Sequence, residues 1–219
     1  MAGNINIPDR KSEEFVFPVS DDFTVTLRTE IPLFTGGGKQ AKRINRFYAK
    51  KLRRTAAYYR KTSKKAGRRP LYPRKIVMTY ELSDMTAEHT SILRKITFES
   101  EAAVTDRYFS ENWSSTGDIM FLEDLLPSAA ARKRRIADAI YEKCSSFHTV
   151  NFSKKLKRDI IRYFSPENFY FKEGSIYIFY QPGQIADEKH GLISVPLDFN
   201  SIMPTPKCDK KQKKAAERN

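Results

Sequence analysis

Apolar and polar residues alternate with a period of two near the N-terminus, which predicts β-strands there. Residues 14–19 and 23–27 both show this alternation, and Ser20-Asp21-Asp22 between them has the composition of a turn. The pattern therefore predicts a β-hairpin. Further strands are expected over 75–80, 91–98 and 104–113.

Between residues 40 and 62 the apolar spacing changes to steps of three and four, which is typical of an amphipathic helix. The apolar stripe of this predicted helix consists of Ile44, Phe47, Tyr48, Leu52, Ala56 and Tyr59. Similar spacing predicts two more helices, over 128–147 and 153–164. Glu123 and Asp124 come before the first of these, and Asp124 or Ser128 is expected to cap it.

Three short strands are expected towards the C-terminus, over 169–171, 175–180 and 192–197. Gly174 lies between the first two, where a tight turn needs a residue that accepts positive φ. Because strands and helices follow one another without a βαβ rhythm, the chain is expected to be α+β. The predicted architecture is an antiparallel sheet with helices packed on one face.

The order of these C-terminal motifs resembles one known module. The motifs are Phe169-Tyr170-Phe171, Gly174, 176–180, Ile185-Ala186, Gly191 and 193–196, and earlier matches are Ile31-Pro32, Ile44-Asn45, Ser91-Ile92, 116–118 and 122–126. The chain is similar over about residues 23–202 to the C-terminal domain of RsiV-type anti-sigma factors, which also accompanies some bacterial polysaccharide deacetylases. The resemblance implies a lysozyme-sensing or cell-envelope-related binding module whose partner is a protein or a cell-wall glycan.

This resemblance suggests how the chain is organised. Residues 1–12 are expected to be a flexible N-terminus, 13–203 a single RsiV C-terminal-like α+β domain, and 204–219 a basic disordered tail. The chain as written shows no signal peptide and no transmembrane segment, which favours a cytoplasmic location. The resemblance favours an extracytoplasmic one, and the sequence leaves both open.

The 219-residue chain has a formal net charge of +14, and the excess is confined to one segment. Sixteen Lys and Arg residues and no Asp or Glu lie between Lys39 and Lys75, while the remainder holds 24 basic and 26 acidic residues. The candidate basic face of the long helix comprises Lys50, Lys51, Arg53, Arg54, Arg60 and Lys61. This face would either contact a polyanion, such as nucleic acid or an anionic surface, or simply be solvated.

No motif in the sequence indicates catalysis, so we expect a binding protein and not an enzyme. His89, His148 and His190 lie in different predicted elements without partners at metal-ligand spacing, so neither a metal nor a cofactor is expected. Cys144 and Cys208 are expected to be free thiols.

The loop between the last two strands is the candidate partner-binding segment. Its candidate contact residues are Gln181, Gly183, Gln184, Asp187, Glu188 and His190. Ile185 and Ala186, in the middle of this loop, are expected to anchor it in the core. The sequence names neither the partner nor the oligomeric state.

Overall fold

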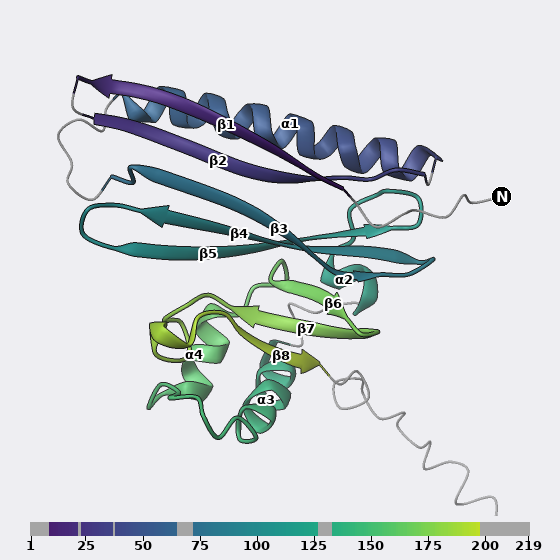
Figure 1. Cartoon of the computed structure of the whole chain (residues 1–219). Coiled ribbons are helices and arrows are strands. Elements are labelled where there is room, and N and C mark those ends of the chain that lie inside the picture. Colours follow the sequence, from purple (N-terminus) through teal and green to yellow (C-terminus); the bar gives the residue numbers. More distant parts are fainter. Residues whose placement is uncertain (1–8, 22, 37, 65–71, 127–132, 198–219) are drawn as a thin grey trace, which may run out of the picture.

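The computed structural model describes residues 9–21, 23–36, 38–64, 72–126 and 133–197. Within these residues the chain forms a five-stranded sheet of order β1-β2-β3-β4-β5 and a three-stranded sheet of order β6-β7-β8. Helix α1 lies along the first sheet, and α3 and α4 accompany the second (Figure 1). The predicted α+β class is confirmed, and the predicted single sheet is divided into two.

The N-terminal hairpin pairs β1 (Asp9–Ser20) with β2 (Phe23–Leu33) in antiparallel register. It is longer than the alternation alone indicated. Residues 9–12, which the sequence assigned to a flexible N-terminus, pair with the far end of β2, where Lys11 lies opposite Ile31. The first eight residues lie outside the described part of the chain. The strand extends to Asp9 because β2 continues past Leu27 and offers backbone partners to it.

Helix α1 (Gly38–Ser63) follows β2 and packs against the first sheet. It buries four of the six residues of the predicted stripe, together with Ala41, which the stripe did not include: the four are Ile44, Tyr48, Leu52 and Ala56. Asn45 fixes the entry to this helix: its side-chain amide donates to the carbonyl of Phe34 and accepts from the Phe34 N–H, both at 2.9 Å. The chain then enters β3 (Lys75–Met85), which pairs parallel to β2 over residues 26–29 and 75–78. This β2–α1–β3 unit corrects the expectation that no βαβ unit is present.

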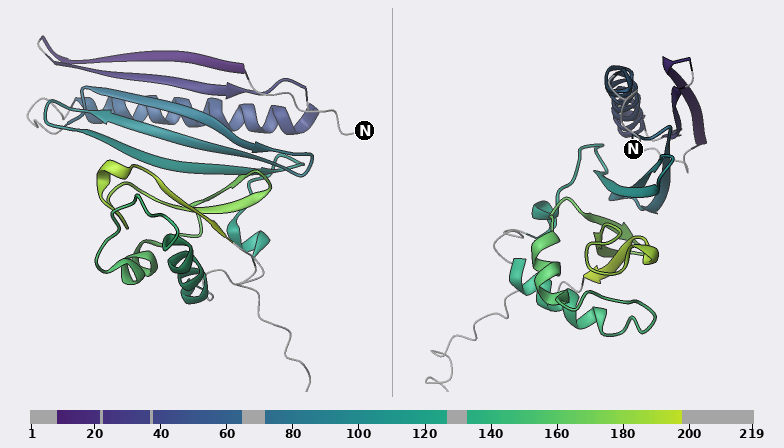
Figure 2. Two further views of the ribbon diagram at one scale, coloured as in Figure 1. Left: turned by 60° about the horizontal axis from the view of Figure 1, so that its bottom comes forward. Right: turned by 90° about the vertical axis from the view of Figure 1, so that its left-hand side faces the viewer.

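Strands β3, β4 (His89–Glu99) and β5 (Val104–Ser114) form an antiparallel meander that completes the first sheet. The core between this sheet and α1 includes Val25, Leu27, Ile76, Met78 and Trp113. The end-on view in Figure 2 shows α1 covering one face of the sheet.

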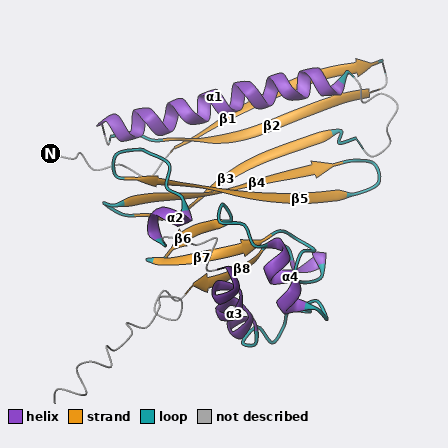
Figure 3. Ribbon diagram, turned by 180° about the vertical axis from the view of Figure 1, so that it is seen from behind, coloured by secondary structure: helices purple, strands orange, loops and turns teal. Residues whose placement is uncertain are grey.

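The second sheet consists of β6 (Phe169–Lys172), β7 (Ser175–Tyr180) and β8 (Ile193–Leu197), as predicted within one residue. The β6–β7 turn places Glu173 and Gly174 at φ of 52° and 72°, the double positive φ of a tight hairpin turn. Helices α2 (Leu122–Leu125), α3 (Lys133–Cys144) and α4 (Leu156–Tyr163) bury Leu122, Ile136, Ile140 and Ile160 in a second core with this sheet. Figure 3 shows α3 and α4 beside the second sheet.

Phe121 is the N-cap residue of α2, and Asp124 at the third position of this helix accepts a hydrogen bond from the N–H of Phe121 at 2.7 Å, as in a capping box. Asp124 therefore does take part in a helix cap, but in that of its own short helix and not of the following one. Ser128, the alternative cap, lies outside the described residues. None of the described helices combines the length and the apolar character needed to cross a membrane.

The two sheets meet where β6 lies against β3, β4 and β5. A chain of buried polar groups joins them: the Ser91 hydroxyl donates to Asn112 at 2.7 Å and accepts from the N–H of Phe171 at 3.0 Å. The Asn112 amide in turn donates to the carbonyl of Phe169 at 2.9 Å. Because each of these buried groups has a partner, the contact fixes the position of one sheet against the other.

Candidate functional site at the edge of β5

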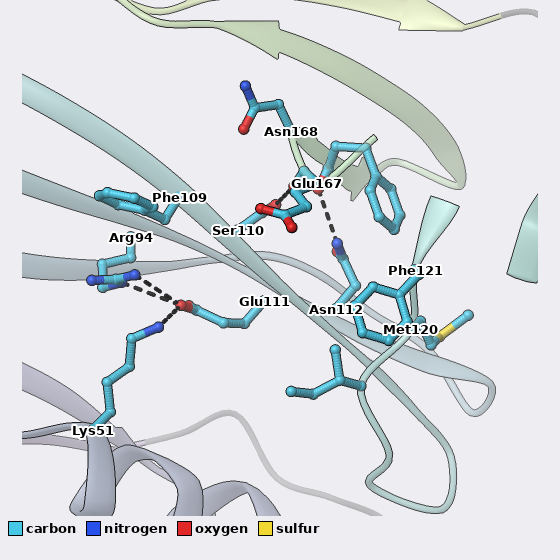
Figure 4. Close-up of a pocket in the computed structure, with 12 residues that line it drawn as sticks. Lys51, Arg94, Phe109, Ser110, Glu111, Asn112, Met120, Phe121, Glu167 and Asn168 are labelled. Atoms are coloured by element: carbon cyan, nitrogen blue, oxygen red, sulfur yellow. Dashed lines mark hydrogen bonds and ion pairs between the residues drawn. The ribbon is translucent and has the colours of Figure 1, made fainter. Parts of the chain in front are cut away.

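Three charged side chains converge beneath the edge of β5. The guanidinium of Arg94 contacts Oε1 of Glu111 through both Nε and Nη2, each at 3.2 Å, and the ammonium of Lys51 contacts the same oxygen (Figure 4). The hydroxyl of Tyr48 donates to the other carboxylate oxygen at 3.4 Å. The side chains of Glu111, Arg94 and Lys51 are 6%, 8% and 24% exposed, so this is an interior cluster that opens to solvent at Lys51.

Strand register and helix pitch bring these residues together. Arg94 lies opposite Phe109 in the β4–β5 ladder, which makes Glu111 its diagonal neighbour on the same face. That face is covered by α1, where Tyr48 and Lys51 are three residues apart and therefore adjacent on the helix surface. Strand β4 thus provides one cation, α1 provides the other, and β5 provides the carboxylate between them.

Positive charge exceeds negative charge at the floor of this site, because two cations share one carboxylate. Burial lowers the pKa of Lys51, and Arg94 lowers it further, while Glu111 acts in the opposite direction. Burial, followed by the nearby Glu111, raises the pKa of Tyr48 well above its usual value, so this phenol remains a hydrogen-bond donor. An additional anion beside Lys51 would favour the charged form of this side chain and so raise its pKa.

Aromatic rings flank both cations. The ammonium of Lys51 lies 5.0 Å from the centre of the Phe47 ring, and the guanidinium carbon of Arg94 lies 4.4 Å from that of Phe109. Each ring offers its negative face to a cation. The two contacts hold the long side chains in place and reduce the conformational freedom that an incoming anion would otherwise have to restrict.

The cluster forms the floor of a cavity of about 220 Å³ that wraps around the edge of β5. Three of its lining side chains are large, apolar and solvent-exposed: Phe109 at 42%, Ile119 at 41% and Phe121 at 53%. Residues 167–169 form the outer wall, with the exposed carboxylate of Glu167 among them. The cavity therefore has a cationic floor and an apolar rim.

A braced turn positions Ile119 and Phe121 on this rim. Gly117 has φ of +79°, and a Cβ built on it would meet the backbone of Gln40 at 3.1–3.2 Å, so a side chain would clash there. The Gln40 amide donates to the carbonyl of Ser114 at 2.8 Å, and Arg43 forms an ion pair with Asp118 at 2.7 Å. Helix α1 thereby holds the 114–118 turn from one side.

Sequence reasoning included Lys51 but missed Arg94 and Glu111. A signal for Glu111 exists in the alternation of β5: Phe109 and Trp113 face α1, and Glu111 between them occupies an inward position that is unfavourable for an unpaired charge. The identity of its partners could not be read from this pattern, because they lie on two other elements.

The predicted basic face is divided by the structure. Lys50, Arg53, Arg54, Arg60 and Lys61 are exposed on α1, and none of them forms an ion pair with another described residue. Lys51 does not belong to this face. Its side chain turns under β5 because it follows Tyr48 by one turn, on the flank of the helix that approaches Glu111.

The predicted partner-binding loop is held largely by its own side chains. Ile185 and Ala186 are buried, as expected. Gln181 binds the backbone of Tyr108 with its side-chain amide, and the Gln184 side chain accepts from the Gln181 N–H at 2.9 Å. His190 lies in a short 3₁₀ helix (Glu188–His190), and its Nε2 accepts from the Asn151 N–H at 3.1 Å.

Three of the six candidate contact residues of that loop are exposed to solvent: Gly183, Asp187 and Glu188. The proposal that this loop binds a partner stays a prediction, now narrowed to these positions.

The histidines are dispersed, and no group of three His, Cys, Asp or Glu side chains converges in a metal-binding arrangement within the described residues. His89 stacks on Phe171 with ring centres 3.9 Å apart and lies 3.6 Å from the Asp84 carboxylate. Cys144 is a buried free thiol in α3, and Cys208 lies outside the described part of the chain.

No family model matches this sequence, and no curated protein matches it. Solved structures do match its fold. A DUF3298 family protein from Pseudomonas aeruginosa PAO1 is 12% identical, with a TM-score of 0.59 over 90% of this chain and 92% of that one. A member of the same family from Bacteroides fragilis NCTC 9343 is 10% identical, with a TM-score of 0.61 over 91% of this chain and 92% of that one.

At this level of identity the likeness concerns the fold, and the RsiV-type resemblance stays a prediction from sequence. Both DUF3298 structures align with this chain over about nine tenths of its length. The chain therefore has the fold seen in DUF3298 family proteins.

Proposed function

We propose that this chain is a non-catalytic recognition module that binds a partner protein through an anionic group with an apolar neighbour. The observation that carries the proposal is the cavity at the edge of β5, where a cluster with two cations and one carboxylate lies beneath three exposed apolar side chains. Soluble proteins seldom expose large apolar side chains together without a binding role.

The arrangement suits binding better than bond-breaking chemistry. Each charged group of the floor is engaged with another, and among the described residues that line the cavity no nucleophile stands beside a base. The cations are held by their aromatic neighbours and by Glu111, so they are placed in advance for an anion. Electrostatic complementarity of this kind selects a partner by charge, and the apolar rim adds affinity.

A small probe tests this proposal. N-acetyl-phenylalanine carries one carboxylate beside one aromatic ring. The control is N-acetyl-phenylalaninamide, in which a neutral amide of similar size replaces the carboxylate. By the efficiency typical of small ligands we expect the acid to bind with a roughly millimolar dissociation constant. The amide should bind at least tenfold more weakly. Nitrogen-15 chemical shifts would locate the site through the amides of residues 94, 109–112 and 119–121.

A matched pair of variants provides the control. Lys51→Met removes one cation of the floor, whereas Lys50→Met removes an exposed charge from the adjacent position of the same helix. Binding of the acid should be lost in the first variant and retained in the second. Equal binding of acid and amide, or the same loss in both variants, would contradict a cationic recognition site.

A second candidate function rests on the outer face of α1. Lys50, Arg53, Arg54, Arg60 and Lys61 are exposed without acidic partners among the described residues, so their field is not neutralised locally. This face would bind a polyanion such as nucleic acid. Heparin chromatography tests it: retention should fall steeply with salt and should be lost when Lys50, Arg53, Arg54 and Lys61 are replaced by Gln. No retention at low salt would refute it.

A further inference from the structure

Strand β5 is an edge of the five-stranded sheet, and most of its outward-facing backbone near the cavity is already occupied. The N–H of Tyr108 donates to Oε1 of Gln181 at 2.8 Å, and its carbonyl accepts from Nε2 of the same side chain at 2.6 Å. Further along, the carbonyl of Asn112 accepts from the N–H of Met120 at 2.8 Å. Ser110 lies halfway between these two blocked positions.

The register of the ladder shows which way Ser110 faces. Strands β4 and β5 pair without a bulge from Glu99–Val104 to His89–Ser114, and backbone groups in such a ladder point alternately to the partner strand and away from it. The backbone groups of Tyr108 and Asn112 point away from β4, so the backbone N–H and carbonyl of Ser110 do too. Among the described residues, neither the N–H nor the carbonyl of Ser110 has a hydrogen-bond partner.

Ser110 also lines the cavity described above. An unpaired strand edge binds extended peptides through main-chain hydrogen bonds. Here one donor and one acceptor are exposed between two blocked positions four residues apart, a gap of roughly 13 Å at the rise of a β-strand. That length holds about three residues of an extended chain.

We propose that the partner of this site is a short extended peptide segment, which adds to β5 opposite Ser110 and places an acidic side chain on the Lys51–Arg94–Glu111 cluster. The inference rests on the proposed function and specifies its partner. The partner chain supplies one carbonyl and one N–H to Ser110. It leaves the strand edge on both sides of Ser110, because Gln181 already occupies the backbone of Tyr108 and Met120 occupies the carbonyl of Asn112.

The alternation of side chains sets the sequence that this segment requires. The residue paired with Ser110 directs its side chain to the same face as Ser110, towards residues 167–169. The residues before and after it therefore direct their side chains to the face of Phe109 and Glu111, where the cations lie. One of these two is acidic and contacts Lys51 and Arg94, and the other is apolar and contacts the exposed ring of Phe109 or Phe121. The motif is acidic-x-apolar or its reverse.

The carboxylate of Glu167 on the outer wall refines this expectation. It is exposed and therefore screened, but it has the same charge as the proposed ligand. Glu167→Gln should strengthen binding of an acidic segment by a few-fold, whereas it should leave a neutral segment unaffected.

The test uses blocked peptides, so that no terminal carboxylate takes part. Acetyl-Gly-Glu-Ala-Phe-Gly-amide and acetyl-Gly-Phe-Ala-Glu-Gly-amide present the two orders of the motif. For the tighter of the two, exchange of Glu for Gln should weaken binding at least tenfold. Methylation of the central Ala nitrogen, which removes the donor to the Ser110 carbonyl, should also weaken it at least tenfold, as measured by calorimetry on the full chain.

Two variants of Ser110 separate the backbone from the side chain. Ser110→Pro removes the outward N–H, which the β4–β5 ladder does not use, and a strand edge tolerates proline at such a position. Ser110→Ala retains the N–H and removes only the hydroxyl that donates to the carbonyl of Glu167 at 3.2 Å. Peptide binding should be lost in the first variant and retained in the second, with thermal unfolding as the check on folding.

The outcomes distinguish this inference from the function on which it rests. If N-acetyl-phenylalanine binds at the cavity but the methylated peptide and Ser110→Pro bind as well as their parents, strand addition is overturned and the recognition module stands. If the blocked peptides fail to bind while N-acetyl-phenylalanine binds, the site requires the free carboxylate of a chain end and not an internal acidic side chain. That result also overturns the proposal. If neither peptide nor N-acetyl-phenylalanine binds, the proposed function is overturned with it.

Discussion

The side chain of Gln181 substitutes for one residue of a missing strand beside Tyr108. Its amide oxygen accepts from the Tyr108 N–H at 2.8 Å, and its amide nitrogen donates to the Tyr108 carbonyl at 2.6 Å, so both backbone groups of an edge residue are satisfied. Gln181 follows β7 directly, and the contact therefore ties the second sheet to the edge of the first.

Replacement of Gln181 by Met should lower the free energy of unfolding by about 1–2 kcal/mol, because two hydrogen bonds are lost at a partly buried position. The amide hydrogen of Tyr108 should also exchange faster with solvent in this variant. Lys172→Met, at an exposed position of β6, is the control and should leave both quantities unchanged. An unaltered exchange rate of the Tyr108 amide would show that the hydrogen bonds from the Gln181 side chain do not protect this strand edge.

The buried carboxylate of Glu111 should be among the most sensitive positions of the chain. Glu111→Ala leaves Lys51 and Arg94 without a counter-charge, and we expect a loss of about 3–5 kcal/mol in urea unfolding. Glu99→Gln breaks an ion pair with Lys75 that is exposed on both sides, and it should cost less than about 1 kcal/mol. Similar losses in both variants would mean that the cluster is not a buried one.

The β6–β7 turn allows a test of backbone conformation alone. A Cβ at Gly174 would meet no atom within 4 Å, so any effect of a substitution comes from its φ of +72°. Gly174→Val should destabilise the chain by about 1–2 kcal/mol, because a β-branched residue resists positive φ. Gly174→Asn should cost clearly less, since Asn accepts this region more readily. An equal unfolding midpoint for Val and Gly would refute the left-handed turn.

Burial raises the pKa of the Cys144 thiol to about 11. The folded state therefore binds this proton more tightly than the unfolded state does, and the stability that follows is complete below pH 9 and lost as the pH rises towards 11. In a Cys208→Ser background, alkylation of Cys144 at pH 8 should be at least a hundredfold slower than in urea. Between pH 8 and 10 its rate should rise about tenfold per pH unit; fast labelling at pH 8 would contradict the burial.

The elements themselves were largely predictable. Local spacing indicated α1 and the strands of both sheets, because a side chain that faces the core repeats every two residues in a strand and every three to four in a helix. Gly174 indicated its turn for an equally local reason. The prediction stopped short at Asp9–Ser12, where polar residues belong to β1 only because β2 continues beside them.

The site was less predictable, because it depends on convergence. Lys51 was placed on a solvated face by its neighbours Lys50 and Arg53, and only the contact with Glu111 on β5 separates it from them. The parallel pairing of β2 with β3 was missed for a related reason. The pairs on either side of it are antiparallel, and the connection through α1 makes β3 run parallel to β2. The residue pattern within a single strand does not indicate the direction of its neighbour.

That parallel pairing divides the five-stranded sheet into parts that differ in how they can fold. The β1–β2 hairpin and the β3–β5 meander close through neighbouring residues, whereas joining Thr26 to Lys75 closes a long segment that contains all of α1. Closing a long segment costs entropy before any contact between its ends forms. We therefore expect these two local units to form early, and the docking of α1 onto β2 to set the rate at which they become one sheet. Substitutions of the buried Tyr48 or Leu52 of α1 should then slow refolding more than substitutions within the hairpin or the meander.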